Sequence, residues 1–176
     1  MRPKPASHVE AWRAGPRTTL VAVCDADERR LEEACPALAG DGFLGGWAKA
    51  DEFPRYLDIV SVATPPDTHR EVVEACAAKS RLIVCEKPLA TTAKDAEIMV
   101  NICQKTGTIL LTNHGRRFSP FLRQVRADLE RRIGHPQAAA CWYSGGLWEG
   151  GSHAADLLAW FLGPVPGQSR GIPWPS

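Results

Sequence analysis

Short apolar runs alternate with amphipathic helical stretches over residues 18–112. The predicted strands occupy residues 19–24, 58–63, 81–85 and 108–112. Each is mostly hydrophobic on both faces, as a strand buried inside a parallel sheet must be. Because helical patterns separate these strands, the sequence predicts an α/β fold with a doubly wound parallel sheet.

Helix start signals precede the amphipathic stretches. The predicted N-cap residues share a side-chain oxygen that can accept a hydrogen bond from a first-turn amide, and they are Ser7, Asp27, Thr68, Thr92, Ser119 and Ser152. Thr68 and Thr92 are each followed three residues later by an acidic residue, which is the spacing of a capping box. A strand-like run at residues 138–143 precedes the last helix, which we expect to end at Gly163.

Composition and charge restrict the classes of partner. The chain has 176 residues, of which 44% are hydrophobic, enough for one sizeable core, and its net charge of +1 gives no global attraction to nucleic acid or an anionic membrane. Its apolar runs are far shorter than the roughly 20 residues of a membrane span. The six cysteines form no C-x-x-C pair, so we expect a cytoplasmic protein whose cysteines are reduced, buried and structural.

Polar residues follow each predicted strand, at the edge of the sheet where ligands bind in doubly wound folds. Asp25 is placed either to bind the ribose hydroxyls of a dinucleotide or simply to cap a helix. Thr64 opens a proline-rich turn after the second strand, and Asn113 follows the fourth. Glu86 and Lys87 follow the third strand, where the lysine is either a proton donor or half of a surface ion pair, and the Lys-Pro bond can be cis.

The start of the last helix carries a further candidate site, in which His153 and Asp156 lie three residues apart. Two ligands do not complete a metal site, and no G-x-S-x-G motif supports a Ser/His/Asp triad. A histidine here can exchange a proton with a substrate hydroxyl. The arginines within residues 116–132 are interrupted by Asp128 and Glu130, which favours a solvated helix face over nucleic-acid binding.

In their order along the chain, four motifs resemble the Gfo/Idh/MocA family of nicotinamide-dependent oxidoreductases. The motifs are Thr64-Pro65-Pro66 with His69, Glu86-Lys87-Pro88, Asn113-His114 with Arg117-Phe118 and Pro120, and Gly151-Ser152-His153 with Asp156. The resemblance runs from about residue 8 to residue 165. It implies a Rossmann-like NAD(P)-binding domain at residues 1–116 and the beginning of a second α+β domain at 117–165. The proline and glycine content of residues 166–176 and their lack of periodicity predict a disordered tail.

The resemblance also implies roles for individual residues. The expected reaction is hydride transfer between NAD or NADP and a hydroxyl or carbonyl carbon of a sugar, polyol or related small molecule, with Lys87 and His153 as catalytic residues. The implied cofactor-binding residues are Asp25, Thr64, Pro65, His69, Glu86 and Asn113, and the implied substrate-binding residues are Arg117, Glu149 and Asp156. No metal is implied. The Asp25 carboxylate would repel a 2′-phosphate and so favours NAD, against the influence of Arg29 and Arg30.

Three features depart from the family pattern. The chain has no G-x-G-x-x-G loop or preceding strand before its first helix, Glu149 stands where the family often has aspartate, and a Pro/Gly-rich stretch follows Gly163. We therefore expect a chain truncated at both ends, with a closed-up or strained sheet and exposed apolar surface that favours homo-oligomers. The alternative function is that of a catalytically inactive remnant or binding module, and cofactor binding distinguishes the two.

Overall fold

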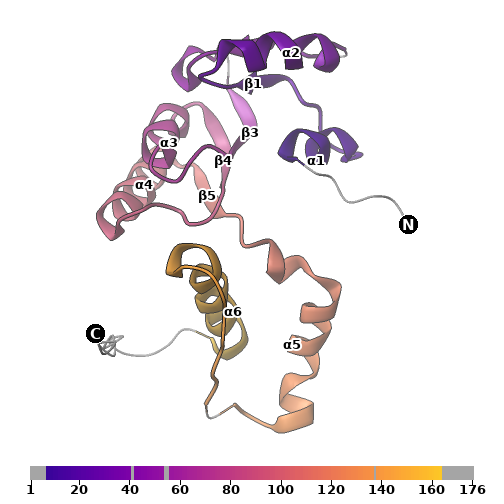
Figure 1. Cartoon of the computed structure of the whole chain (residues 1–176), viewed down its shortest axis with the longest axis vertical. Helices are drawn as coiled ribbons and strands as arrows, with labels where there is room; N and C mark the ends of the chain where they lie inside the picture. Colours follow the sequence, from indigo (N-terminus) through magenta and orange to yellow (C-terminus); the bar gives the residue numbers. More distant parts are fainter. Residues whose placement is uncertain (1–6, 41, 54–55, 137, 164–176) are drawn as a thin grey trace. The chain divides into compact units, whose positions relative to one another are not determined.

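The computed structural model describes residues 7–40, 42–53, 56–136 and 138–163. It divides into two compact units, Met1–Asn113 and His114–Ser176, and each is described by itself (Figure 1). The domains expected at residues 1–116 and 117–165 stay predictions, and the tail expected at 166–176 lies outside the described residues.

The first unit alternates strands and helices. Its helices are α1 (His8–Ala14), α2 (Glu28–Leu38), η1 (Ala50–Glu52), α3 (His69–Ala77) and α4 (Ala93–Thr106). Its strands are β1 (Ala22–Cys24), β2 (Gly45–Trp47), β3 (Leu57–Val62), β4 (Ser80–Cys85) and β5 (Ile109–Thr112). All four predicted strands are present, as β1, β3, β4 and β5. Strand β2 was not predicted, because its sequence Gly-Gly-Trp has no strand pattern.

The strands form two parallel sheets, β1-β2 and β3-β4-β5, instead of one. Within the described residues, β1 pairs only with β2 and β3 pairs only with β4, so each has one edge without a strand partner. The sheet is therefore divided and not closed up, and the strained sheet that we named as the alternative stays a prediction. Val21, just before β1, still packs against the core of the larger sheet.

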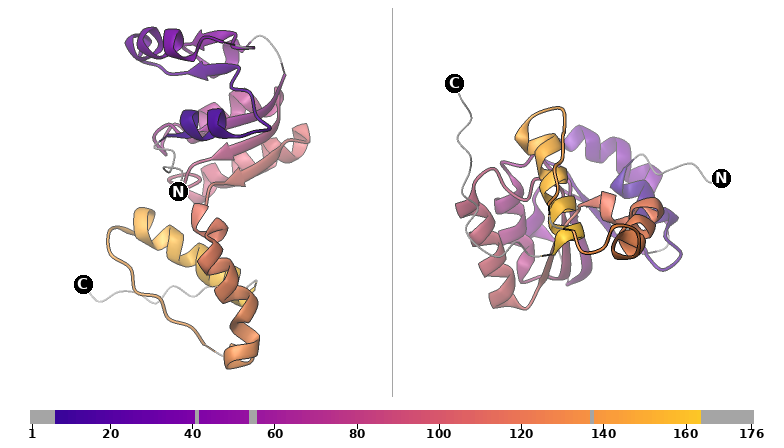
Figure 2. Two further views of the ribbon diagram at one scale, coloured as in Figure 1. Left: turned by 90° about the vertical axis from the view of Figure 1, so that its right-hand side faces the viewer. Right: turned by 90° about the horizontal axis from the view of Figure 1, so that it is seen from below.

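Helices α3 and α4 lie side by side on one face of the larger sheet (Figures 1 and 2). Val62, Val73, Ile83 and Met99 are almost completely buried there. On the other face, the paired positions Ile59, Leu82 and Ile109 stand in one row, in which Ile59 is 37% and Ile109 60% exposed. Parallel sheets are usually covered on both faces, so this is apolar surface that association could bury.

The buried cysteines belong to the core of the larger sheet. Cys76, Cys85 and Cys103 are buried, and burial raises the pKa of Cys76 to about 11 and that of Cys85 to about 12. All six cysteines are free thiols. Cys24 and Cys141 are exposed, so the predicted burial is wrong for these two.

Several predicted caps are confirmed. Ser7 accepts a hydrogen bond from the Glu10 amide at 3.2 Å, Asp27 from the Arg29 amide at 3.1 Å and Thr92 from the Asp95 amide at 3.1 Å. Thr68 occupies the N-cap position of α3, but the predicted side-chain cap is wrong. The Thr68 hydroxyl donates to the carbonyl of Pro65 at 2.8 Å and accepts no hydrogen bond from an amide of α3.

The second unit contains η2 (Gly115–Phe118), α5 (Pro120–Ile133), the π-helical turn η3 (Leu147–Gly151) and α6 (Ser152–Leu162). The strand predicted at residues 138–143 is absent, since these described residues form no regular element. The cap predicted at Ser152 is wrong, because Ser152 is the first residue of α6 and Gly151 occupies the N-cap position. The Ser152 hydroxyl donates back to the Trp148 carbonyl at 2.9 Å. Gly163 ends α6 with a φ of 82°. No described helix is long and apolar enough to cross a membrane.

Replacing Met99 by alanine tests the core between α4 and the larger sheet. Met99 is fully buried, so the Met99→Ala variant should lose about 2–5 kcal/mol of unfolding free energy, measured by urea denaturation. Glu97→Ala, at an exposed position of the same helix, should change stability by no more than about 0.5 kcal/mol. Equal effects of the two variants would contradict the described packing of α4.

Candidate functional site

The carboxyl ends of β3, β4 and β5 meet at one edge of the larger sheet. The register pairs Val62 with Cys85 and Cys85 with Thr112. Backbone bonds continue past the strand ends, because the Glu86 amide donates to the Val62 carbonyl at 2.9 Å and the Asn113 amide to the Cys85 carbonyl at 2.7 Å. Glu86 and Asn113, which sequence analysis placed after different strands, are thereby held side by side.

The carboxylate of Glu86 binds three donors. Its Oε1 accepts hydrogen bonds from Asn113 Nδ2 at 2.6 Å and His8 Nε2 at 2.9 Å, and its Oε2 accepts one from the Lys87 amide at 3.2 Å. The other ring nitrogen of His8 lies 2.6 Å from Ser61 Oγ on β3. Sequence analysis missed His8 and Ser61, because no local pattern relates residues so distant in the chain.

The hydrogen bonds determine the charge of Glu86. Burial by itself would raise the pKa of this carboxyl group. The bonds from Asn113, His8 and the Lys87 amide, together with the charge of His8, outweigh burial and hold the pKa of Glu86 below its ordinary value. Glu86 is therefore ionised at neutral pH.

Lys87 follows directly and is half-buried. Its bond to Pro88 is cis, as the sequence allowed. Glu86 is bound by the backbone amide of Lys87 and not by its ammonium group, and the Lys87 side chain forms no ion pair within the part of the chain that the structure describes. The surface ion pair that competed with a chemical role for Lys87 is thus not formed.

The turn after β3 contains three more predicted residues. Thr64 and Pro65 are exposed at the edge of the sheet, whereas His69 is fully buried. His69 Nε2 lies 2.8 Å from the Thr64 carbonyl and Nδ1 lies 3.1 Å from the Leu89 carbonyl. His69 therefore connects the turns after β3 and β4, and it can shape the edge only through their backbones, not by the direct lining role that was expected.

Asp25 does not cap α2, whose N-cap is Asp27, and its binding of a ribose stays a prediction. Its Oδ1 accepts a hydrogen bond from the Asp27 amide at 2.9 Å, which shapes the turn after β1. Its Oδ2 lies 3.5 Å from Arg30 Nη1, and 38% of the side chain is exposed. The carboxylate thus keeps an accessible oxygen, with a cation beside it.

His153 lies in a cluster of charged and aromatic side chains in the second unit. Asp156, only 7% exposed, is bound by Arg117 through Nη2 at 2.5 Å and through Nε at 2.8 Å. His114 Nε2 lies 3.8 Å from Asp156 Oδ1, and the His114 ring meets the His153 ring edge to face at 6.1 Å. Arg117 and Asp156 neutralise each other and join η2 to α6, while Glu149 is exposed in η3. Sequence analysis assigned no role to His114.

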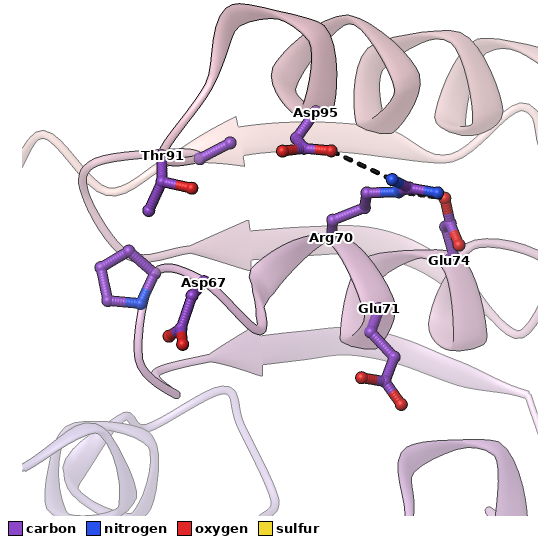
Figure 3. A pocket seen from close by; sticks show the side chains of 8 residues that line it. Asp67, Arg70, Glu71, Glu74, Thr91 and Asp95 are labelled. Carbon is purple, nitrogen blue, oxygen red and sulfur yellow. Dashed lines mark hydrogen bonds and ion pairs between the residues drawn. The ribbon is translucent and has the colours of Figure 1, made fainter.

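A pocket of about 420 Å³ opens between the first turns of α3 and α4 (Figure 3). Its charged lining residues are Asp67, Arg70, Glu71, Glu74 and Asp95. Arg70 binds Glu74 at 2.9 Å and Asp95 at 3.1 Å, so its charge is already compensated and acidic groups dominate. This pocket disfavours the phosphates of a dinucleotide, and among the described residues no acidic, histidine or cysteine cluster could hold a metal ion.

Comparison with known proteins identifies the family. The model of an oxidoreductase family with an NAD-binding Rossmann fold, Gfo/Idh/MocA, matches residues 5–114. The chain belongs to the Gfo/Idh/MocA family. The expected family and the α/β Rossmann fold are thereby confirmed.

Curated relatives and solved structures resemble the chain over part of their length. D-apiose dehydrogenase of Paraburkholderia graminis is 37% identical over 131 residues, which are 74% of this chain and 35% of that protein. Inositol 2-dehydrogenase of Rhizobium meliloti is 30% identical over 175 residues, 90% of this chain and 52% of that protein. The WlbA dehydrogenase of Bordetella pertussis, solved with NADH and UDP-GlcNAcA, superposes with a TM-score of 0.70 at 28% identity, over 90% of this chain and 52% of that one. The chain spans about a third to a half of such relatives.

Replacing Glu86 by glutamine tests its charged hydrogen bonds. At pH 7 the Glu86→Gln variant should be less stable than wild type by about 1–2 kcal/mol, measured by urea denaturation. Because the folded pKa of Glu86 is lowered, its stabilisation is present above the unfolded value of about 4.3 and is lost as pH falls through the folded pKa. The difference should therefore shrink at about pH 3, whereas a pH-independent difference would contradict the assignment.

The ion pair of the second unit yields a different prediction. Asp156→Asn should leave the Arg117 charge uncompensated and destabilise the contact between η2 and α6 by about 2–3 kcal/mol, seen as faster amide exchange in α6. Asp128→Asn is a matched control, because Arg131 and Arg132, which bind Asp128, are about 70% exposed. Its effect should stay below about 1 kcal/mol, and similar exchange rates in the two variants would argue against a structural role for Asp156.

Proposed function

We propose that the chain forms the nicotinamide-binding part of an NAD(P)-dependent oxidoreductase. The reaction is hydride transfer between the cofactor and a hydroxyl or carbonyl carbon of a sugar, polyol or related small molecule. Membership of the Gfo/Idh/MocA family and the relatives named as D-apiose and inositol dehydrogenases support this class of substrate. The structural observation that carries the proposal is the ionised Glu86, bound to Asn113 and followed by Lys87, at the ligand-binding edge of the sheet.

The chemistry of the edge fits the nucleoside ends of the cofactor. Asp25 keeps an accessible carboxylate oxygen at the end of β1 that can accept a bond from a ribose hydroxyl. Thr64 and Asn113 lie at the ends of β3 and β5 and offer hydrogen-bonding groups on the nicotinamide side. The G-x-G-x-x-G pattern occurs at residues 40–45, where it leads from α2 into β2. It does not join a strand to the N-terminus of a helix, which is the position from which such a motif cradles a diphosphate.

The identity of the dinucleotide depends on two opposed charges. The Asp25 carboxylate disfavours the 2′-phosphate of NADP. Arg30, whose Nη1 lies 3.5 Å from Asp25, offsets part of that repulsion. We therefore propose NAD as the preferred cofactor, with a modest margin over NADP.

The proposed catalytic residues handle the substrate oxygen and its proton. The bound nicotinamide would supply the carbon that accepts or donates hydride. The Lys87 ammonium group, half-buried and without an ion pair to the described residues, donates a hydrogen bond to the substrate oxygen. His153 exchanges the proton of that oxygen as a general acid or base. Glu86 orients the backbone of Lys87 by accepting its amide hydrogen.

The three predicted substrate-binding residues fall into two groups, a bound pair and one exposed residue. Arg117 and Asp156 are bound to each other, so we propose that they act on the substrate only by positioning α6 and thereby His153. Glu149 is exposed and stays a candidate for direct contact with substrate hydroxyls.

Other properties follow the same proposal. The free cysteines with raised pKa values suit a reducing compartment such as the cytoplasm. The exposed apolar row Ile59, Leu82 and Ile109 suits a homo-oligomer. Nucleic-acid binding has no support in the arginines of α5, because Arg126 stacks on the Trp160 ring at 4.9 Å and other arginines of the helix bind Asp128.

One observation favours the second candidate function, an inactive remnant or binding module of the same fold. The division of the sheet leaves the edges of β1 and β3 without partners in the described residues, at the point where dinucleotides bind in doubly wound sheets.

A titration of the full chain with NADH distinguishes the two functions. Energy transfer from tryptophan to bound nicotinamide should reveal micromolar binding of NADH and weaker binding of NADPH, and Asp25→Ala should reduce this difference. Lys87→Ala should keep NADH affinity while lowering polyol or sugar oxidation by about 100-fold or more, with exposed Lys94→Ala as control. A folded chain that binds neither dinucleotide would overturn the enzyme and favour the remnant.

A further inference from the structure

Helix α1 is only partly buried, at His8, Val9 and Trp12. It is seven residues long, and none of its residues is buried. Its side-chain links to the larger sheet are made by His8, which reaches Ser61 at 2.6 Å and Glu86 at 2.9 Å. Ser61 stands opposite the buried Val60 and Val62 in the alternation of β3, so His8 meets the sheet on the face away from α3. Polar contacts of His8 therefore connect this helix to β3 and to the turn after β4.

The partners of His8 determine which ring nitrogen carries hydrogen. A carboxylate only accepts, so Nε2 must donate to Glu86. In the neutral ring, Nδ1 then accepts from the Ser61 hydroxyl, and in the protonated ring it donates to the same oxygen. Because a hydroxyl can play both parts, the link survives in either protonation state.

The two donors on Glu86 Oε1 come from separate elements. Asn113 approaches from the end of β5 and His8 from α1, at 2.6 and 2.9 Å. Among the described residues, the Lys87 amide alone donates to Oε2, so this oxygen retains capacity to accept from a ligand hydroxyl. Removing His8 would leave Asn113 as the single side chain restraining rotation of the carboxylate.

We propose that His8 is a positioning residue, which fixes the Glu86 carboxylate and the adjoining Lys87 backbone at the dinucleotide-binding edge. His8 acts through Glu86 and does not itself touch the cofactor. The effect on cofactor affinity rests on the proposed function, whereas the restraint on Glu86 does not. The lowered pKa of Glu86, to which the His8 hydrogen bond and charge contribute, is consistent with this role.

Two substitutions of His8 separate positioning from simple packing. The amide nitrogen of His8→Gln can reach the place of Nε2 and donate to Glu86, whereas His8→Leu fills similar space without a donor. Arg13→Ala, at an exposed position of the same helix, is the matched control. The full-length variants are compared by carbon-13 NMR titration of the Glu86 carboxyl group, by NADH affinity and by thermal unfolding.

The expected pattern is specific to a donor at residue 8. His8→Leu should raise the Glu86 titration midpoint and weaken NADH binding about fivefold to tenfold, the net size of one ordinary hydrogen bond. His8→Gln should restore most of both values, and Arg13→Ala should change neither. In a Glu86→Gln background, His8→Leu should weaken NADH binding no further, because the route through the carboxylate is already lost.

Each other result has a defined meaning. An unchanged titration midpoint of Glu86 in His8→Leu overturns the proposal, regardless of the NADH affinity. Loss of NADH affinity that His8→Gln does not restore, or that persists equally in the Glu86→Gln background, also overturns it and reduces His8 to a packing residue. If wild type binds no NADH while the midpoint rises in His8→Leu alone, the proposed function fails and the positioning of Glu86 by His8 stands.

Discussion

The parallel register of β3, β4 and β5 brings the turns after these strands to one edge, and the Glu86 carboxylate holds that edge together. Backbone bonds place Glu86 beside Val62 and Asn113 beside Cys85. The carboxylate then gathers donors from α1, from β5 and from its own chain. Because buried or half-buried charge is tolerated only when it is hydrogen-bonded, ionisation of Glu86 and alignment of the strand ends support each other.

The second unit is also organised around a hydrogen-bonded carboxylate, that of Asp156, whose charge is compensated by Arg117. Arg117 binds the nearly buried Asp156 through two nitrogens, which joins η2 to α6 and brings His114 against His153. Because the Arg117 guanidinium already donates to Asp156, it is poorly placed to bind substrate as well. The proton-transfer role proposed for His153 thus depends on an ion pair that performs no chemistry itself.

The first unit carries two separate sheets, β1-β2 and β3-β4-β5. The larger sheet has a well-packed face beneath α3 and α4 and an apolar row on its other face. Between β1 and β3 the ladder is interrupted, so the smaller sheet joins the core through side chains such as Val21. Unpaired strand edges and uncovered apolar rows both favour association, and both lie in the unit that carries the cofactor motifs.

The sequence by itself determined the elements and the family. Strands β3, β4 and β5 and the caps at Ser7, Asp27 and Thr92 depend on residues close together in the chain, so local patterns reveal them. The order of the motifs sufficed to predict the family, and the alternation of strand and helix patterns sufficed to predict the α/β fold. The failures are also local: β2 has no strand pattern, residues 138–143 have one without a sheet to join, and the Thr68 hydroxyl bonds backward to Pro65 instead of capping.

Only the tertiary structure decided how the candidate residues are used. His8 and Glu86 are 78 positions apart, and Arg117 and Asp156 are 39 apart, so no periodicity or spacing connects them. The same applies to His69, whose burial converts an expected cofactor contact into a link between two backbone turns. Hydrogen-bond partners of this kind depend on which strand ends and helices the fold brings together, and local sequence carries no information on that.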